Sequence, residues 1–271
     1  MNNSIVNGSP NYGPSTNTEL YCRSYIDSYE INTGTGLRIY EVLGEQNGNS
    51  DTLSVAIEEF DPKGKSPAHF HSRAEEYQYV MEGCGKLIVG NQIKMVSKGD
   101  FIKIPKGMNH QTFNESLNKT LKLCCFLTPS WTSEDTTFTN EAALDFNEKA
   151  DDIYMRKKEN CSEINAGKGE FIYEFLGKEN GPADDISIAL VEIQEGCSSE
   201  AHLHPEAEEY YIGIEGQGRL VIDGETRYLT PYAINKIPKG IVHQIFNDKK
   251  EDLKFLCVCA PAWTPECYVK V

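Results

Sequence analysis

The sequence has few basic residues for its length. Its 271 residues contain 26 lysines and arginines against 41 aspartates and glutamates, which gives a formal net charge of -15. A protein that binds nucleic acid or an anionic membrane needs clustered Lys and Arg to neutralise phosphates. We therefore expect neither kind of partner, which leaves a small-molecule substrate or another protein.

Long apolar runs and a targeting signal are also missing. No segment approaches the roughly 18 consecutive apolar residues of a membrane-spanning helix. Residues 1–18, "MNNSIVNGSPNYGPSTNT", are rich in Asn, Ser, Gly and Pro and lack the basic start and apolar stretch of a secretory signal. We expect a flexible tail over residues 1–18 and a cytoplasmic protein.

The nine cysteines include no Cys-x-x-Cys pair, which disfavours a structural zinc site and a thioredoxin-type redox centre. Cys124, Cys125, Cys257 and Cys259 lie inside apolar runs. In that setting a free cysteine behaves as a small apolar side chain. We expect these four to be buried and free of disulfides.

The sequence does contain a long internal repeat with an offset of 133 residues. "EINTGTG" at Glu30 returns as "EINAGKG" at Glu163, and "IYEVLGEQNG" at Ile39 returns as "IYEFLGKENG" at Ile172. Self-similarity of this length indicates a duplicated structural unit. We predict one unit over residues 19–132, a surface linker over residues 133–152 and a second unit over residues 153–271.

Each copy has the periodicity of β-strands. Short apolar runs such as "LSVAIEEF" and "EYQYVMEG" alternate with turn sequences such as "EGCG" and "IPKG", and helical periodicity is weak throughout. Many short strands joined by tight turns are typical of a sandwich or a small barrel. We predict an all-β chain with one such unit in each half.

The histidines are few, and all belong to the repeat. Both copies contain His-x-His-x4-Glu-x6-Gly, and a later block in each copy supplies one more histidine. Alternation along a strand places the first two imidazoles of each copy on one face. The predicted metal ligands are His69, His71, Glu76 and His110 in the first copy and His202, His204, Glu209 and His243 in the second.

Three imidazoles and one carboxylate suit Fe, Mn, Ni, Co, Cu or Zn, so the ligand types do not identify the metal. We expect up to two divalent transition metal ions per chain. Each ligand glutamate has a glutamate before it, but only Glu76 and Glu209 leave six residues before Gly83 and Gly216. Alternation then turns Glu75 towards the opposite face of the strand.

These motifs resemble those of the cupin superfamily. The second block of the first copy, Gly-x5-Pro-x-Gly-x2-His-x3-Asn, runs from Gly99 to Asn114 at the cupin spacing, and the second copy departs only in having Tyr232 and Ala233 at its start. The resemblance implies two tandem cupin jelly-roll barrels related by internal duplication, each with a metal inside. The whole chain is similar to the quercetin-dioxygenase-like bicupins.

The resemblance leaves the reaction open. We expect a metal-dependent oxygenase acting on a small oxygenated metabolite, with Glu76 or Glu209 also serving as a base. The alternatives are an isomerase or lyase of an enolisable hydroxy-carbonyl compound, with Tyr211 as general acid, and a non-enzymatic binding protein. Oxalate decarboxylase-like bicupins carry an arginine shortly before the first motif histidine, where this chain has Ser66-Pro67-Ala68. Assembly into a homo-oligomer stays open.

The walls of the two pockets are expected to differ. Strand parity nominates one set of side chains in the first barrel, Gln78, Val80, Thr112 and Asn114, and another in the second, Tyr211, Gly213, Ile245 and Asn247. The first motif is flanked by three basic residues, Lys63, Lys65 and Arg73, and the second by Glu195, Cys197 and Glu206. We therefore expect a basic entrance and an anionic substrate in the first barrel.

Overall fold

The computed structural model describes residues 21–44, 50–140, 153–178, 180–181, 183 and 185–271. Within these residues the chain is built from β-strands, with single 3-10 turns η1 (Tyr25–Asp27), η3 (Lys158–Asn160) and η4 (Pro265–Cys267) and no α-helix. The predicted all-β fold is confirmed. No described helix is long and apolar enough to cross a membrane.

The first barrel consists of two facing sheets. Its seven-stranded sheet has the order β13 (Met155–Arg156), β9 (Phe101–Ile104), β6 (Glu75–Glu82), β11 (Leu121–Thr128), β4 (Ser54–Phe60), β3 (Leu37–Leu43) and β2 (Glu30–Asn32). Its five-stranded sheet has the order β12 (Thr136–Phe138), β5 (His69–His71), β10 (His110–Phe113), β7 (Cys84–Val89) and β8 (Gln92–Ser97).

The second barrel repeats this arrangement. Its seven-stranded sheet has the order β1 (Tyr21–Ser24), β21 (Ala233–Ile237), β18 (Glu208–Glu215), β23 (Leu253–Ala260), β16 (Ser187–Ile193), β15 (Glu170–Leu176) and β14 (Glu163–Gly167). Its five-stranded sheet has the order β20 (Glu225–Leu229), β19 (Gly218–Ile222), β22 (His243–Phe246), β17 (His202–Leu203) and β24 (Val269–Lys270).

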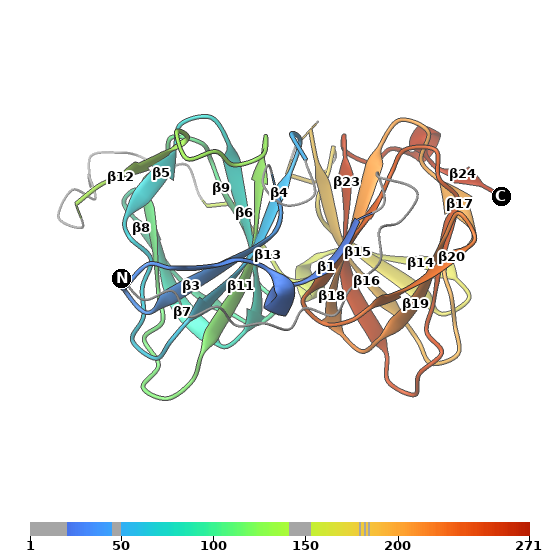
Figure 1. Ribbon diagram of the computed structural model, residues 1–271, viewed down its shortest axis with the longest axis horizontal. Coiled ribbons are helices and arrows are strands. Elements are labelled where there is room, and N and C mark those ends of the chain that lie inside the picture. Colours follow the sequence, from blue (N-terminus) through green and yellow to red (C-terminus); the bar gives the residue numbers. More distant parts are fainter. Residues whose placement is uncertain (1–20, 45–49, 141–152, 179, 182, 184) are drawn as a thin grey trace.

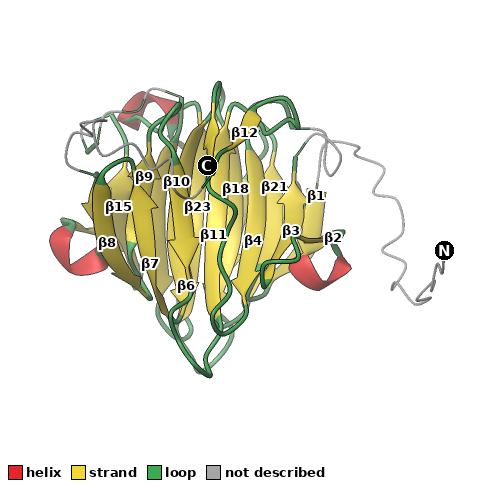
Figure 2. Ribbon diagram, turned by 90° about the vertical axis from the view of Figure 1, so that its left-hand side faces the viewer, coloured by secondary structure: helices red, strands yellow, loops and turns green. Residues whose placement is uncertain are grey.

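The two barrels lie side by side (Figure 1), and one cluster of buried apolar side chains draws on both. Alternation along β6 turns Tyr77 and Tyr79 outward into this shared core, while Val80 points into a separate core inside the first barrel. The rings of Phe101 and Phe175, one from each barrel, stack there with centroids 5.4 Å apart. The central strands of the seven-stranded sheets, such as β6 and β18, are thus buried on both faces. Figure 2 shows strands side by side with loops at both ends.

The motif glycines are explained by a close approach of two chain segments. Gly83 has a φ of +79° after β6, and a Cβ at this position would lie 2.5 Å from the Thr120 carbonyl oxygen. Gly216 repeats this geometry beside the Asp252 carbonyl at 2.6 Å. Both positions therefore require glycine, because a side chain would clash with backbone.

The first strand of each repeat pairs with the other barrel. β1 pairs antiparallel with β21 of the second barrel, and β13 pairs antiparallel with β9 of the first. The hydroxyls of the equivalent Tyr21 and Tyr154 donate hydrogen bonds back to their own repeats, at the carbonyls of Val42 (2.8 Å) and Phe175 (2.6 Å). Exchanged strands and a shared core thus join the barrels.

Parts of the predicted organisation lie outside the described residues. These are the expected tail over residues 1–18 and residues 141–152 of the expected linker. The described part of that linker includes β12, which pairs with β5 next to the histidine motif. The boundaries of the two units remain predictions.

Candidate metal centres

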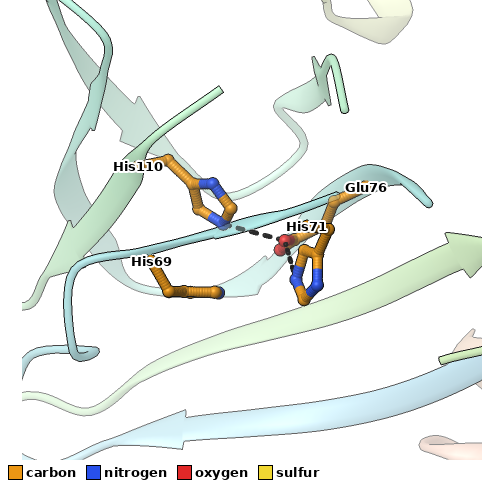
Figure 3. A group of neighbouring side chains, drawn as sticks. All are labelled: His69, His71, Glu76 and His110. Atoms are coloured by element: carbon orange, nitrogen blue, oxygen red, sulfur yellow. Dashed lines mark ion pairs between the residues drawn. The ribbon is translucent and has the colours of Figure 1, made fainter. Parts of the chain in front are cut away.

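The four predicted ligands of the first barrel come together on its inner surface. His69 and His71 lie on β5, His110 faces His69 directly across the β10–β5 pair, and Glu76 comes from β6 in the opposite sheet. The four ligand atoms lie within 4.8 Å of one another. Figure 3 shows the side chains pointing toward a common space, with the Glu76 carboxylate between His71 and His110.

The carboxylate oxygen of Glu76 lies close to two imidazole nitrogens. Its Oε2 is 2.8 Å from Nε2 of His110 and 3.2 Å from Nε2 of His71. Burial alone would raise the pKa of Glu76, but His110 and His71 hold it well below its usual range. Burial, with His110 beside it, lowers the pKa of His69 to about 4. The centre therefore favours an ionised carboxylate and a neutral His69.

The second barrel repeats the centre from equivalent strands. His202 on β17 faces His243 on β22, His204 follows β17, and Glu209 lies on β18. The Oε2 atom of Glu209 is 2.6 Å from Nε2 of His243, 3.5 Å from that of His204 and 3.9 Å from that of His202. The four ligand atoms again lie within 4.8 Å of one another.

Five of the six imidazoles are oriented by backbone carbonyls. The ring Nδ1 atoms of His69, His110, His202, His204 and His243 lie 2.8–3.1 Å from the carbonyl oxygens of Pro67, Met108, Glu200, Cys267 and Ile241, respectively. A carbonyl can only accept a hydrogen bond, so Nδ1 carries the proton in each ring. When Nε2 carries no proton, each of these rings directs the lone pair of Nε2 to the centre, as a metal ligand requires.

The donor sets fit a divalent transition metal. The facing atoms Glu76 Oε2, His110 Nε2, Glu209 Oε2, His204 Nε2 and His243 Nε2 are buried and have no hydrogen-bond partner. Converging lone pairs of this kind repel one another unless a cation lies between them, because buried polar groups need a partner. The chain thus has two metal-binding sites, one in each barrel.

A cavity adjoins each centre. The cavity of the first barrel has a volume of about 530 Å³ and that of the second about 340 Å³. Apolar side chains dominate both walls, for example Leu37, Leu127 and Trp131 in the first and Ile172 and Phe255 in the second. No Lys or Arg is among the described residues that line them.

The prediction of a basic entrance to the first pocket is wrong for the cavity wall. Lys63 donates through Nζ to the Glu115 carbonyl (2.7 Å), and the Arg73 guanidinium donates to the Ser130 carbonyl (2.5 Å). Neither these two residues nor Lys65 lines the cavity. Spacing in the sequence could not show that loop carbonyls hold these cations.

Of the wall residues expected from strand parity, only Tyr211 lines a cavity, and its ring centroid lies 5.9 Å from that of His243. Gln78 instead donates through Nε2 to Glu76 Oε1 at 2.7 Å. The remaining residues have structural roles: Val80 and Ile245 belong to the apolar cores, Asn114 and Asn247 donate to carbonyls of strand ends and loops, Thr112 pairs with β7, and Gly213 abuts Thr230.

Five cavity carboxyls were missed by sequence reasoning, and two of them have raised pKa values. Glu58 on β4 lines the first cavity, and Glu170 on β15 lines the second. Burial, with Glu76 nearby, raises the pKa of Glu58 to about 7, and burial, with Glu209 nearby, raises that of Glu170 to about 7. The sequence held a signal for Glu58 and Glu170, because in each case the repeat aligns a glutamate with an apolar residue of the other copy. Glu58 aligns with Val191, and Glu170 aligns with Leu37.

Asp135 was also missed, because it lies in the predicted linker. Its carboxylate is buried, accepts the backbone N–H of Arg73 at 2.5 Å and lies 3.6 Å from Nδ1 of His71. The Thr136 hydroxyl lies 3.3 Å from the same nitrogen. His71 is thus the one ligand imidazole among the described residues that side chains, and no backbone carbonyl, hold at Nδ1.

Comparisons with known proteins agree with this architecture. The cupin domain family matches the chain twice, at residues 56–126 and 189–259. A putative germin-like protein of Oryza sativa subsp. japonica is 32% identical over 106 residues, which are 35% of this chain and 45% of that protein. An uncharacterized protein of Methanocaldococcus jannaschii is 38% identical over 72 residues, 27% of this chain and 57% of that protein. The chain thus spans about half the length of these curated relatives.

Solved structures with the same two-barrel fold include oxalate decarboxylases. That of Bacillus subtilis has a TM-score of 0.75 at 17% identity, over 96% of this chain and 80% of the other. The formate complex of the Lactobacillus farciminis enzyme has a TM-score of 0.76 at 17% identity, over 96% and 90%. The chain belongs to the cupin superfamily, as a bicupin with one three-histidine, one-glutamate centre in each barrel.

Proposed function

We propose that this bicupin is a metal-dependent enzyme that oxidises an apolar small molecule with dioxygen, the substrate binding through its own oxygen atoms. The observation that carries this proposal is the setting of each centre. Its open side adjoins a mainly apolar cavity whose described wall has no Lys or Arg. An apolar wall with a few polar groups is typical of a site for a mainly apolar ligand.

Charge in the cavities argues against a small dianion such as oxalate as substrate. The first cavity carries Glu41 and Glu58 beyond the ligand set, and the second carries Glu170 and Glu174, while its Glu200 is paired with Lys270. Apart from the metal ion itself, the described cavity walls offer no Lys or Arg to offset the second charge of such a dianion, and an unpaired buried charge is strongly disfavoured. A neutral molecule with enol, phenol or carbonyl oxygens meets no such penalty.

The ligand side chains hold the centres in a geometry suited to this role. Each centre would bind one ion of Fe, Mn, Ni, Co, Cu or Zn, which when bound supplies a Lewis acid or a redox centre with positions open to substrate. The Gln78 amide donates a hydrogen bond to Oε1 of Glu76, so Oε2 is the oxygen that faces the histidines. Glu76 and Glu209 are the candidate bases for a substrate hydroxyl, because each carboxylate lies at the edge of its cavity.

An oxygen-consumption screen of the metal-reconstituted protein tests the proposal. We expect oxygen uptake with a phenolic, enolic or hydroxy-carbonyl compound of apolar body. That uptake should be lost when the ligand glutamate of the active barrel is replaced, by Glu76→Ala if the first barrel is active or by Glu209→Ala if the second is. Glu75→Ala is the matched control for the first barrel, since Glu75 pairs with Lys103 (2.8 Å) on the opposite face. Turnover that proceeds unchanged without oxygen would contradict an oxygenase.

A second candidate is a metal-dependent lyase or isomerase of an enolisable hydroxy-carbonyl compound. Tyr211 favours it: burial, with Glu209 nearby, raises the pKa of this phenol well above its usual value, so the hydroxyl stays protonated on the wall of the second cavity. It would act as a general acid toward a substrate oxygen. Anaerobic turnover that is lost in Tyr211→Phe would support this candidate over the oxygenase.

A further inference from the structure

The second barrel places two thiols beside its metal centre. Cys257 and Cys259 are alternate residues of β23, so their side chains point to the same face. They lie across from Tyr211 and Glu209 of the neighbouring strand β18, and both line the second cavity. Free cysteines in apolar runs were expected to be inert filling, but these two reach a cavity wall.

The Glu209 carboxylate lies between the thiols and the imidazoles. Its Oε1 accepts from the Cys257 thiol at 2.9 Å and lies 3.9 Å from Sγ of Cys259, while its Oε2 faces the histidines. The two sulfurs and a Glu209 oxygen lie within 4.8 Å of one another, which makes them a potential ligand group of their own. One carboxylate therefore presents an oxygen to each of two donor sets.

We propose that Cys257, Cys259 and Glu209 form a second metal subsite in this barrel, one that takes a thiophilic ion such as Cu⁺, Zn²⁺ or Cd²⁺. Thiolates select such soft ions, whereas the adjacent imidazole and carboxylate set accepts harder divalent ions. Binding displaces the two thiol protons to solvent and changes no oxidation state. This subsite is additional to the proposed oxidation and does not depend on it.

The first barrel shows which changes create the subsite. Cys125 is the counterpart of Cys257, since it lies across from Gln78 as Cys257 lies across from Tyr211. The counterpart of Cys259 is Leu127, which lies across from Glu76.

The partner of Oε1, the carboxylate oxygen that does not face the histidines, also differs between the barrels. In the first barrel the Gln78 amide donates to Oε1 of Glu76 at 2.7 Å, so that oxygen already has a partner. Two differences, a leucine for a thiol and a glutamine for a tyrosine, thus remove the soft donor set from the first barrel.

A cadmium titration tests the subsite. Protein preloaded with Mn²⁺ is titrated with Cd²⁺, and the ultraviolet thiolate-to-cadmium charge-transfer absorbance and the released Mn²⁺ are both measured. We expect Cys259→Leu, which copies the first barrel, to lose the absorbance of about one bound Cd²⁺ per chain. Cys125→Ser should keep it. Subtracting the titration of Cys259→Leu also removes the background of the exposed Cys22 and Cys84.

Two outcomes would overturn the proposal. One is an absorbance in both Cys259→Leu and Cys259→Ser equal to that of the wild type, provided that both variants keep the wild-type circular dichroism. The other is extra Mn²⁺ release from the wild type relative to Cys259→Leu, because the sulfurs would then only complete the imidazole centre. Leu127→Cys combined with Gln78→Tyr should raise the absorbance by about one more Cd²⁺ per chain, and no increase would count against the donor set.

Discussion

In the first barrel the Glu76 carboxylate is bonded to the Gln78 amide, whereas in the second barrel Glu209 lies against the Cys257 thiol. His71 is held by Asp135 and Thr136, whereas its counterpart in the second barrel is held by a backbone carbonyl. The four ligands repeat while their surroundings differ. A duplicated metal centre therefore keeps its inner geometry with quite different supporting side chains.

The cavity carboxyls make the same point. Each cavity has a half-buried glutamate with a raised pKa, but Glu58 comes from β4 and Glu170 from β15, and the equivalent positions hold Val191 and Leu37. The barrels are thus not copies in their polar groups. Measurements on paired variants show how far this difference extends to stability, metal binding and turnover.

The largest effect is expected in the core that both barrels share. Phe175→Ala removes a ring stacked on Phe101 of the other barrel, so we expect a loss of about 3–5 kcal/mol in the free energy of unfolding, felt by both barrels. Phe255→Ala, in the core inside the second barrel, is the matched control. Calorimetry should show one lowered transition for Phe175→Ala. A shift confined to the second barrel would mean that the shared core does not couple them.

Ligand substitutions come next. His110→Ala and His243→Ala should each remove about one metal ion per chain, with affinity at that centre falling by more than about 100-fold. We expect His110→Ala to abolish turnover and His243→Ala to cost stability more than rate, because the first cavity is the larger. Elemental analysis and kinetics on both variants check this. The reverse pattern would assign turnover to the second barrel.

Asp135→Asn is expected to weaken metal binding in the first barrel alone. Groups that orient a metal-bound imidazole typically contribute about 10–100-fold to metal affinity, and Asp135 supports both His71 and the loop before Glu76. Cys267→Ser is the control in the second barrel, since it keeps the Cys267 carbonyl that lies 2.8 Å from Nδ1 of His204 and changes only the more distant sulfur, at 3.8 Å. Competition with a chelator gives both affinities. Equal weakening in the two variants would contradict this contrast.

A smaller, pH-dependent effect is expected from Glu170. Its pKa is raised to about 7 in the folded protein from 4.5, so the folded state binds more protons between these values. The free energy of unfolding should therefore fall as pH rises through this window, by at most about 1.4 kcal/mol per pH unit. Glu170→Gln should flatten the slope. Urea unfolding of metal-free protein at about pH 5 and about pH 7 measures this, and an unchanged slope would contradict it.

The fold and the ligand set could be predicted because both depend on short-range patterns. Strand alternation puts His69 and His71 on one face, and a duplicated motif tells Glu76 from Glu75. The prediction of two cupin barrels is confirmed by the family match and the sheets. The residues of the cavity walls were harder to predict. Alternation shows which face of a strand a side chain is on, but not whether that part of the strand borders the cavity or the apolar core. Val80 is thus core although it has the parity of the ligands.

Contacts between segments that are far apart in the sequence could not be predicted, because they produce no recognisable sequence pattern. Asp135 reads as a linker residue because its loop is acidic, and only the fold brings it to His71. The partners of β1 and β13 could not be predicted, since a short edge strand carries no mark of the sheet that it joins. Cys257 and Cys259 resemble core residues in an apolar run until β18 places Glu209 across from them.

The exchanged strands also determine the order in which strands can pair while the chain is being synthesised. A ribosome makes β1 before the other described strands, yet β1 pairs with β21, which emerges far later. The first barrel likewise awaits β13, from the start of the second repeat. The first barrel therefore cannot complete its seven-stranded sheet while only the first repeat has left the ribosome. The nascent chain carries β1 unpaired until β21 has been made, so the earliest of the described strands is among the last to pair.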